Sequence, residues 1–306
     1  MIVGPTAVGK THLSIQLAKH FGTEIVSADA RQCYRGMPIG TATPTTEERR
    51  EVKHHLVDFL PVTQPYDVKQ YEQDALKTIA QLHEQRPVVV ATGGSGLYVQ
   101  TLCYGIDEMP AIPASLRSTL QQRLQQEGLF PLLQELEQVD PVYFAEVDQQ
   151  NHRRIMRALE VYYGTGLPYS SFRHRAAGVA RPFRTILVGL HRPRPLLYDR
   201  INQRVEQMIA QGLVDEAHAL YPQRHCQALR TVGYQELFPV FEGQYDLAEA
   251  LRLIKRNTRR YAKRQLTWFR KDAAIRWFEM EEGNEKVQQK IIAYVREQEE
   301  NPTDFA

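Results

Sequence analysis

The distribution of hydrophobic positions predicts a chain in which short strands alternate with helices. Apolar runs typical of buried strands lie at 24–29, 54–60, 87–94, 184–190 and 274–280, and residues 1–3 provide a short first strand. Between several of these runs the apolar residues recur at helical spacing, as in 11–21 and 68–84. This alternation is typical of a parallel sheet with helices on both faces.

The alternation stops between about 107 and 181, where the pattern is almost entirely helical. A strand-like run returns at 184–190. We therefore expect a parallel α/β core formed by residues 1–107 and 182–306. Residues 108–181 are expected to form a helical insertion domain.

A second long helical pattern covers 254–271 and is strongly basic. Between Arg252 and Lys271 the chain has nine basic residues and no acidic one, although its net charge is only +2. Like charges at i, i+4 spacing repel each other, so such a helix indicates a polyanionic partner rather than a solvated face. The apolar positions Leu251, Ile254, Tyr261 and Trp268 are expected to pack on the core.

Composition excludes some classes of protein. The chain of 306 residues is 42% hydrophobic and 24% charged, which is ordinary for a globular protein. No apolar run approaches the ~20 residues of a membrane helix, so no membrane partner is expected. The three cysteines are widely spaced without a CxxC pair, and we expect a cytoplasmic protein with incidental thiols.

The stretch GPTAVGKT matches the phosphate-binding loop G-x-x-x-x-G-K-[ST], with a strand before it and a helix after it. In such a loop backbone N–H groups and a helix N-terminus surround a phosphate group, the lysine reaches the outer phosphates and the hydroxyl binds Mg²⁺. The predicted phosphate-binding residues are Gly4, Pro5, Thr6, Ala7, Val8, Gly9, Lys10 and Thr11, with Thr11 as the metal ligand.

An ATPase or kinase usually adds an acid at the end of a core strand to hold Mg²⁺. Here the run 87–92 continues into Gly93-Gly94-Ser95-Gly96, without a carboxylate. The acid nearest to a strand end is Asp29, which should meet the phosphate loop at the carboxyl edge of the sheet. From the residues alone, two roles of Asp29 are about equally favoured: an acid that takes part in the chemistry, or one that only caps a helix or a turn.

The chain resembles the bacterial tRNA dimethylallyltransferases, also called tRNA isopentenyltransferases, over nearly its whole length. The stretches that carry this resemblance are GPTAVGKT (4–11), IVSADARQCYRGMPIGTATP (25–44), HHLVDFLPV (54–62), ATGGSGLYVQ (91–100), NHRRIMRALEVYYGTGLP (151–168), YDRINQRVEQMIAQGLVDE (198–216), TVGYQEL (231–237) and IKRNTRRYAKRQLTWFRK (254–271). The chain departs from the usual family pattern at Ala30, Thr43, Ser95 and His152.

The resemblance implies transfer of a dimethylallyl group from dimethylallyl diphosphate to N6 of an adenosine (A37) immediately 3′ of the tRNA anticodon. It implies Mg²⁺ as cofactor, Asp29 as general base, and Lys10, Thr11 and Arg204 at the diphosphate. We also expect a monomer. The residues implied in tRNA binding are Asp29, Ala30, Arg31, Gln32, Ser95, Arg117, Gln150, Asn151, His152, Arg153, Arg154, Arg256 and Arg260.

Three alternatives share some of these features. A small-molecule P-loop kinase would use the loop for ATP, but the missing strand-end acid and the basic helix argue against it. An adenylate isopentenyltransferase would share the loop and Asp29 without needing the basic helix or the insertion. A non-catalytic RNA-binding module would not need an intact Lys10, Thr11 and Asp29.

Overall fold

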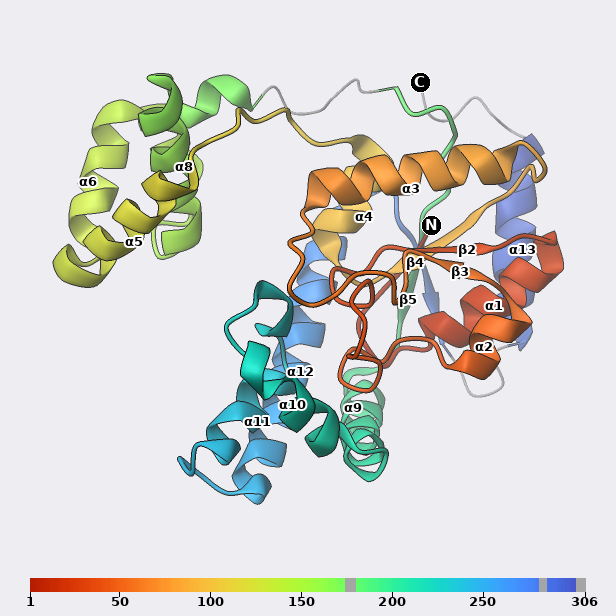
Figure 1. Cartoon of the computed structure of the whole chain (residues 1–306). Coiled ribbons are helices and arrows are strands. Elements are labelled where there is room, and N and C mark those ends of the chain that lie inside the picture. The colour runs from red at the N-terminus through yellow and green to blue at the C-terminus, as the bar shows by residue number, and fades with distance from the viewer. Residues whose placement is uncertain (174–179, 281–284, 301–306) are drawn as a thin grey trace. The chain divides into compact units, whose positions relative to one another are not determined.

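The computed structural model describes residues 1–173, 180–280 and 285–300 (Figure 1). Its contacts divide the chain into two compact units. One unit comprises Met1–Cys103 together with the chain from Arg181 onward, and the other comprises Tyr104–Ala180.

The first unit is built on a six-stranded sheet within the described part of the chain. Its strands are β1 (Ile2–Val3), β2 (Ile25–Ser27), β3 (His54–His55), β4 (Val90–Gly93), β5 (Val188–His191) and β6 (Arg276–Glu279). Their order is β3-β2-β4-β1-β5-β6, and every neighbouring pair is parallel. The predicted parallel α/β core is therefore confirmed, and β1 lies in its interior between β4 and β5.

Helices cover both faces of this sheet (Figure 1). On one face α1 (Lys10–Phe21) and α13 (Glu285–Glu300) share a buried apolar cluster with the strands. On the other face lie α3 (Val68–His83) and α4 (Gly96–Tyr104), whose residues Tyr71, Ala75, Tyr98 and Leu102 are buried. The helices predicted from the apolar rows at 11–21 and 68–84 are confirmed.

Four further helices of this unit share a separate buried cluster with the loop that follows β2. They are α9 (Arg194–Ala210), α10 (Leu213–Leu220), α11 (Tyr234–Phe241) and α12 (Leu247–Phe269). The short α2 (Thr46–Glu51) has no buried residue and does not belong to this cluster. The Glu216 carboxylate accepts hydrogen bonds from Ile39 N (2.9 Å), Gly40 N (2.8 Å) and the Tyr234 hydroxyl (2.6 Å). This anchor fixes the loop against α10 and α11.

Two details of the sequence prediction are wrong. The run 54–60 forms a strand only at His54–His55, because Leu56 and Asp58 have positive φ angles of 59° and 56° that turn the chain away from the sheet. Trp268 is 38% exposed and lies against Gly96 rather than in the core, whereas the predicted Ile254 is buried, together with Ala250, Ala262, Gln265 and Phe269.

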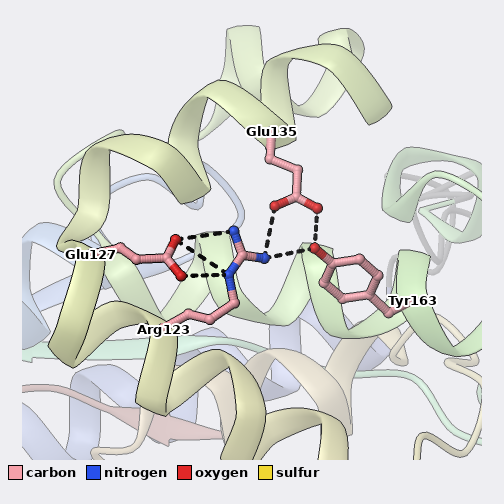
Figure 2. Close-up of polar contacts among 4 residues, drawn as sticks. All are labelled: Arg123, Glu127, Glu135 and Tyr163. Atoms are coloured by element: carbon pink, nitrogen blue, oxygen red, sulfur yellow. Dashed lines mark hydrogen bonds and ion pairs between the residues drawn. The ribbon is translucent and has the colours of Figure 1, made fainter.

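The second unit is helical, with α5 (Ala114–Glu127), α6 (Leu129–Val139), α7 (Pro141–Glu146) and α8 (His152–Thr165). Leu120, Leu132, Leu136 and Leu159 form its buried core. Figure 2 shows how polar side chains add to this packing: the Arg123 guanidinium contacts Glu127, Glu135 and Tyr163, and so links α5, α6 and α8. In the described residues no helix is both long and apolar enough to cross a bilayer.

Candidate functional site

A cavity of about 1130 Å³ opens at the carboxyl ends of β1, β2 and β4. The phosphate loop, the residues after β2, the glycine loop after β4, and helices α9 and α12 all contribute to it. From the predicted site it is lined by Thr6, Ala7, Gly9, Lys10, Thr11, Asp29, Ala30, Arg31, Gln32, Ser95 and Arg204. The structure thus brings the phosphate loop and Asp29 together.

The phosphate loop has a strained backbone that other segments hold in place. Ala7 adopts a positive φ of 63°, which is unfavourable for a residue with a side chain. Arg200 Nε donates to the Ala7 carbonyl oxygen (3.0 Å), and Arg192 Nε donates to that of Val8 (3.1 Å). These arginines follow β5, so the loop is fixed from a distant part of the chain.

Gly4, Pro5 and Val8 support the loop from behind and do not line the cavity. A Cβ atom at Gly4, where φ is 151°, would lie 2.7 Å from the carbonyl oxygen of Leu190 on β5. The carbonyl groups of Gly4 and Pro5 each accept a hydrogen bond of 2.9 Å from Lys10 Nζ. These residues therefore shape the loop through its backbone.

Two cations face the same cavity. Burial lowers the pKa of Lys10 to about 8, against the attraction of Asp29 and with a further lowering by Arg204. The pKa of Arg204 is also lowered, mainly by burial. An anion beside these groups would raise both pKa values again, because it stabilises the protonated forms. The cavity therefore favours a negatively charged ligand.

Asp29 lies at the start of a turn with one carboxylate oxygen fixed. Its Oδ1 accepts from Arg31 N (2.8 Å) and Gln32 N (3.3 Å). Its Oδ2 has no partner among the described residues and is available to a ligand in the cavity. The turn and chemical interpretations of Asp29 are therefore compatible, because each uses a different oxygen.

The neighbouring polar residues have partners inside the protein. Gln32 Nε2 donates to the Ala42 carbonyl oxygen (3.0 Å), and Ser95 Oγ accepts from Ala30 N (2.9 Å). Tyr261 of α12 lies near Ser95 and lines the same cavity. These contacts join the segment after β2, the glycine loop and α12 around one wall of the cavity.

The glycine loop after β4 leaves no room for side chains at three of its four positions. A Cβ atom would lie 2.1 Å from the Ala28 carbonyl oxygen at Gly93, 2.4 Å from Gln265 Nε2 at Gly94, and 2.5 Å from the Trp268 ring at Gly96. The acid that an ATPase carries at this strand end is absent here. An acidic side chain at any of these three positions would collide with the atoms named above.

A bound Mg²⁺ fits the residues that are present. The Thr11 hydroxyl lines the cavity and has no hydrogen-bond partner among the described residues, while those residues contain no cluster of three or more His, Cys, Asp or Glu side chains suited to a metal. Mg²⁺ often keeps several waters and binds through few protein oxygens plus the phosphates of a substrate. Thr11 with a bound diphosphate satisfies that requirement.

The remaining predicted tRNA-binding residues lie outside this cavity. On α12 Arg264 lines it, whereas Arg256 and the exposed Arg260 of the same row do not. The adjacent row instead contacts α9, where Lys255 pairs with Glu206 (2.7 Å) and Arg259 donates to Asn202 Oδ1 (2.6 Å). In the row of Arg256 and Arg260, Arg256 Nε donates to the neighbouring Asn257 Oδ1 (3.2 Å), whereas the exposed Arg260 has no partner among the described residues and is open to an external one.

In the helical unit the predicted residues surround the start of α8. The Asn151 side chain caps this helix by accepting from Arg154 N (3.3 Å), and it is followed by exposed His152 and Arg153. Arg117 instead forms a two-point pair with the buried Glu160, at 2.7 and 3.1 Å. This internal partner explains Arg117 without a nucleic acid.

Sequence reasoning did not single out Arg192, Arg200 or Gln265. All three bind backbone groups of the phosphate loop, Gln265 through Thr6 N at 2.8 Å. Arginines that bind carbonyl groups look like surface arginines in a sequence, and Gln265 sits in a strongly basic pattern.

A phosphate loop and Asp29 that line one cavity, with glycines in place of an acid after β4, fit a P-loop group-transfer enzyme. Residues 32–272 match the IPP transferase family. The tRNA dimethylallyltransferase 2 of Parabacteroides distasonis is 48% identical over 282 residues, covering 92% of this chain and 94% of that protein. The chain belongs to the IPP transferase family.

Solved structures agree with this membership. The full-length tRNA isopentenylpyrophosphate transferase from Bacillus halodurans matches with a TM-score of 0.71 at 37% identity, covering 98% of this chain and 97% of that one. A eukaryotic dimethylallyltransferase acting on tRNA matches in fold with a TM-score of 0.82 at 24% identity, covering 96% and 77%. The resemblance read from the sequence motifs is confirmed.

Proposed function

We propose that this protein transfers a dimethylallyl group from dimethylallyl diphosphate to N6 of the adenosine immediately 3′ of the anticodon in tRNA. Its family membership supports the activity. The observation that carries the reaction is the cavity itself, where the phosphate loop and the open Oδ2 of Asp29 face one another. The bond from carbon 1 to the diphosphate oxygen breaks, and a bond from N6 to that carbon forms.

The phosphate loop stabilises the leaving group. Negative charge develops on the diphosphate as its bond to carbon breaks, and fixed donors and cations stabilise that charge. Lys10, Arg204 and the N-terminus of α1 are placed for this task. Mg²⁺ held by Thr11 would neutralise further charge on the diphosphate.

Asp29 takes the proton that N6 loses. An exocyclic amine is a weak nucleophile, and a carboxylate within hydrogen-bond reach assists its attack. Because Oδ1 is held by two backbone N–H groups, Oδ2 has a fixed direction in the cavity. The adenine must leave the base stack of its loop to reach this oxygen.

The tRNA would bind along two groups of residues. In the first unit these are the segment Ala30–Gln32, Ser95, and the α12 row of Arg256 and Arg260. In the helical unit they are Gln150–Arg154 and the more weakly supported Arg117. Cationic and polar groups of this kind suit an RNA loop, whose backbone is bound by charge and whose bases are read at their edges. We also propose that the protein acts as a monomer.

The test is incubation with labelled dimethylallyl diphosphate, Mg²⁺ and unmodified tRNA. We expect label in tRNA whose anticodon is followed by adenosine, and none in tRNA with another base there. Parallel reactions with free AMP and ATP as acceptors test the adenylate alternative. Label in the free nucleotide but not in tRNA would contradict the proposal, as would phosphate transfer from ATP.

A further inference from the structure

We propose that Gln265 is a positioning residue that couples diphosphate binding to tRNA binding. The proposal rests on the function proposed above and names the physical link between its two substrates. Gln265 belongs to α12, the helix that carries the basic row, yet its side chain ends between two loops of the cavity. Nothing in the reaction chemistry requires a glutamine amide there.

The Gln265 amide joins the two loops directly. Its Oε1 accepts from Thr6 N in the phosphate loop (2.8 Å), and its Nε2 donates to the Gly94 carbonyl oxygen in the glycine loop (2.9 Å). The residue is only 6% exposed. A buried amide with a partner at each end has one stable orientation, so the spacing of the two loops depends on where α12 holds it.

The fit around this bridge is tight. A Cβ atom at Gly94 would lie 2.4 Å from Gln265 Nε2 and 3.5 Å from Lys10 Nζ. The Lys10 ammonium group, which is to bind the diphosphate, therefore lies beside the same backbone segment that Gln265 holds. A displacement of α12 must move Gln265, and with it the donors of the phosphate loop.

The same helix reaches the acceptor side of the cavity one turn earlier. Tyr261 lines the same cavity as Ser95 and lies near it, and Ser95 Oγ accepts from Ala30 N next to Asp29 (2.9 Å). Arg264, adjacent to Gln265, lines the cavity. RNA bound to the outer row of α12 thus acts on one rigid element that contacts both half-sites, which is the arrangement that thermodynamic coupling requires.

The test compares the affinity for inorganic pyrophosphate with Mg²⁺ in the absence and presence of saturating unmodified tRNA. In the unaltered protein we expect tRNA to tighten pyrophosphate binding by on the order of tenfold, and pyrophosphate to tighten tRNA binding by the same factor. Gln265→Met, which fills the space without either hydrogen bond, should bring both ratios close to one.

Two further variants sharpen the result. Gln265→Glu keeps the acceptor for Thr6 N but loses the donor to Gly94 and adds a negative charge near Lys10, so coupling should fall and pyrophosphate binding without tRNA should weaken as well. Gln289→Met, at an exposed position of α13, is the control and should leave both ratios unchanged. Thermal unfolding of each variant shows whether it folds. If Gln265→Met does not fold, Gln265→Glu is used in its place.

The coupling ratio separates this proposal from the proposed function, because neither pyrophosphate nor unmodified tRNA turns over. An unaltered protein without coupling overturns the assignment, and so does a folded Gln265 variant with an unchanged ratio. Coupled binding without any prenyl transfer would contradict the proposed function and support the role of Gln265. Normal transfer with uncoupled substrates would contradict the role of Gln265 alone.

Discussion

Diphosphate binding should weaken in alkaline solution because Lys10 loses its proton near pH 8 in the free protein. Burial lowers the pKa of Lys10 to about 8, and a bound diphosphate would raise it again by supplying negative charge. The protonated form is thus favoured by the ligand. Affinity should be constant well below pH 8 and then fall as pH rises through the pKa of the free protein.

The magnitude follows from one linked proton. The affinity for pyrophosphate should be about tenfold lower at pH 9 than on the acidic plateau, and binding at pH 8 should take up about half a proton per site. Calorimetry of pyrophosphate binding in buffers with different ionisation enthalpies measures this uptake. The Lys10→Arg variant is the control, because arginine stays protonated in this range and the titration of pyrophosphate itself is common to both proteins.

Equal proton uptake by the unaltered protein and Lys10→Arg at pH 8 would refute this reasoning. It would mean that Lys10 is already fully protonated in the free cavity. The two hydrogen bonds from Nζ to the Gly4 and Pro5 carbonyl groups, each 2.9 Å, would then outweigh burial.

Three other substitutions test separate parts of the structure. Asp29→Asn should lower the single-turnover transfer rate by about 10²–10⁴-fold while tRNA affinity is retained; a near-normal rate would exclude Asp29 as the base. Glu216→Ala removes the acceptor of two backbone N–H groups and a tyrosine hydroxyl. It should lower the free energy of unfolding, measured in urea, by about 2–4 kcal/mol. A loss below about 0.5 kcal/mol would mean that water replaces the carboxylate. Arg260→Glu should weaken tRNA binding and reduce its salt dependence by about one unit of slope, whereas Lys290→Glu on α13 should do neither; equal effects would assign them to net charge.

The sheet was predictable wherever hydrophobic spacing and glycine placement agreed. The helix from Lys10 to Phe21 follows from its i, i+4 apolar row, and strand β4 from a continuous β-branched run. The strand predicted at 54–60 is shorter than expected because of the backbone. Leu56 and Asp58 adopt positive φ angles, which turn the chain away from the sheet. An apolar pattern cannot reveal such a turn.

In the site, the residues that belong to a sequence motif could be predicted. The residues that hold the motif in place through its backbone could not. Asp29 was found because it closes the predicted run 24–29, although β2 ends at Ser27, and the structure adds that only one of its oxygens is used internally. Arg200 and Gln265 act on backbone atoms of residues 4–11 from far along the chain. Such contacts depend on tertiary packing, which leaves no local period or spacing in the sequence.

The support of the phosphate loop by Gln265 also sets an order of events during synthesis on the ribosome. Thr6 is made before its partner Gln265, which follows 259 residues later. At about 5–20 residues per second, roughly 13–50 s pass before Gln265 is added. The interior strand β1 likewise cannot complete its pairing until β5, its second neighbour, has been made. A nascent chain therefore exposes its phosphate-loop sequence long before it can bind diphosphate, and we expect binding only after Gln265 has been added.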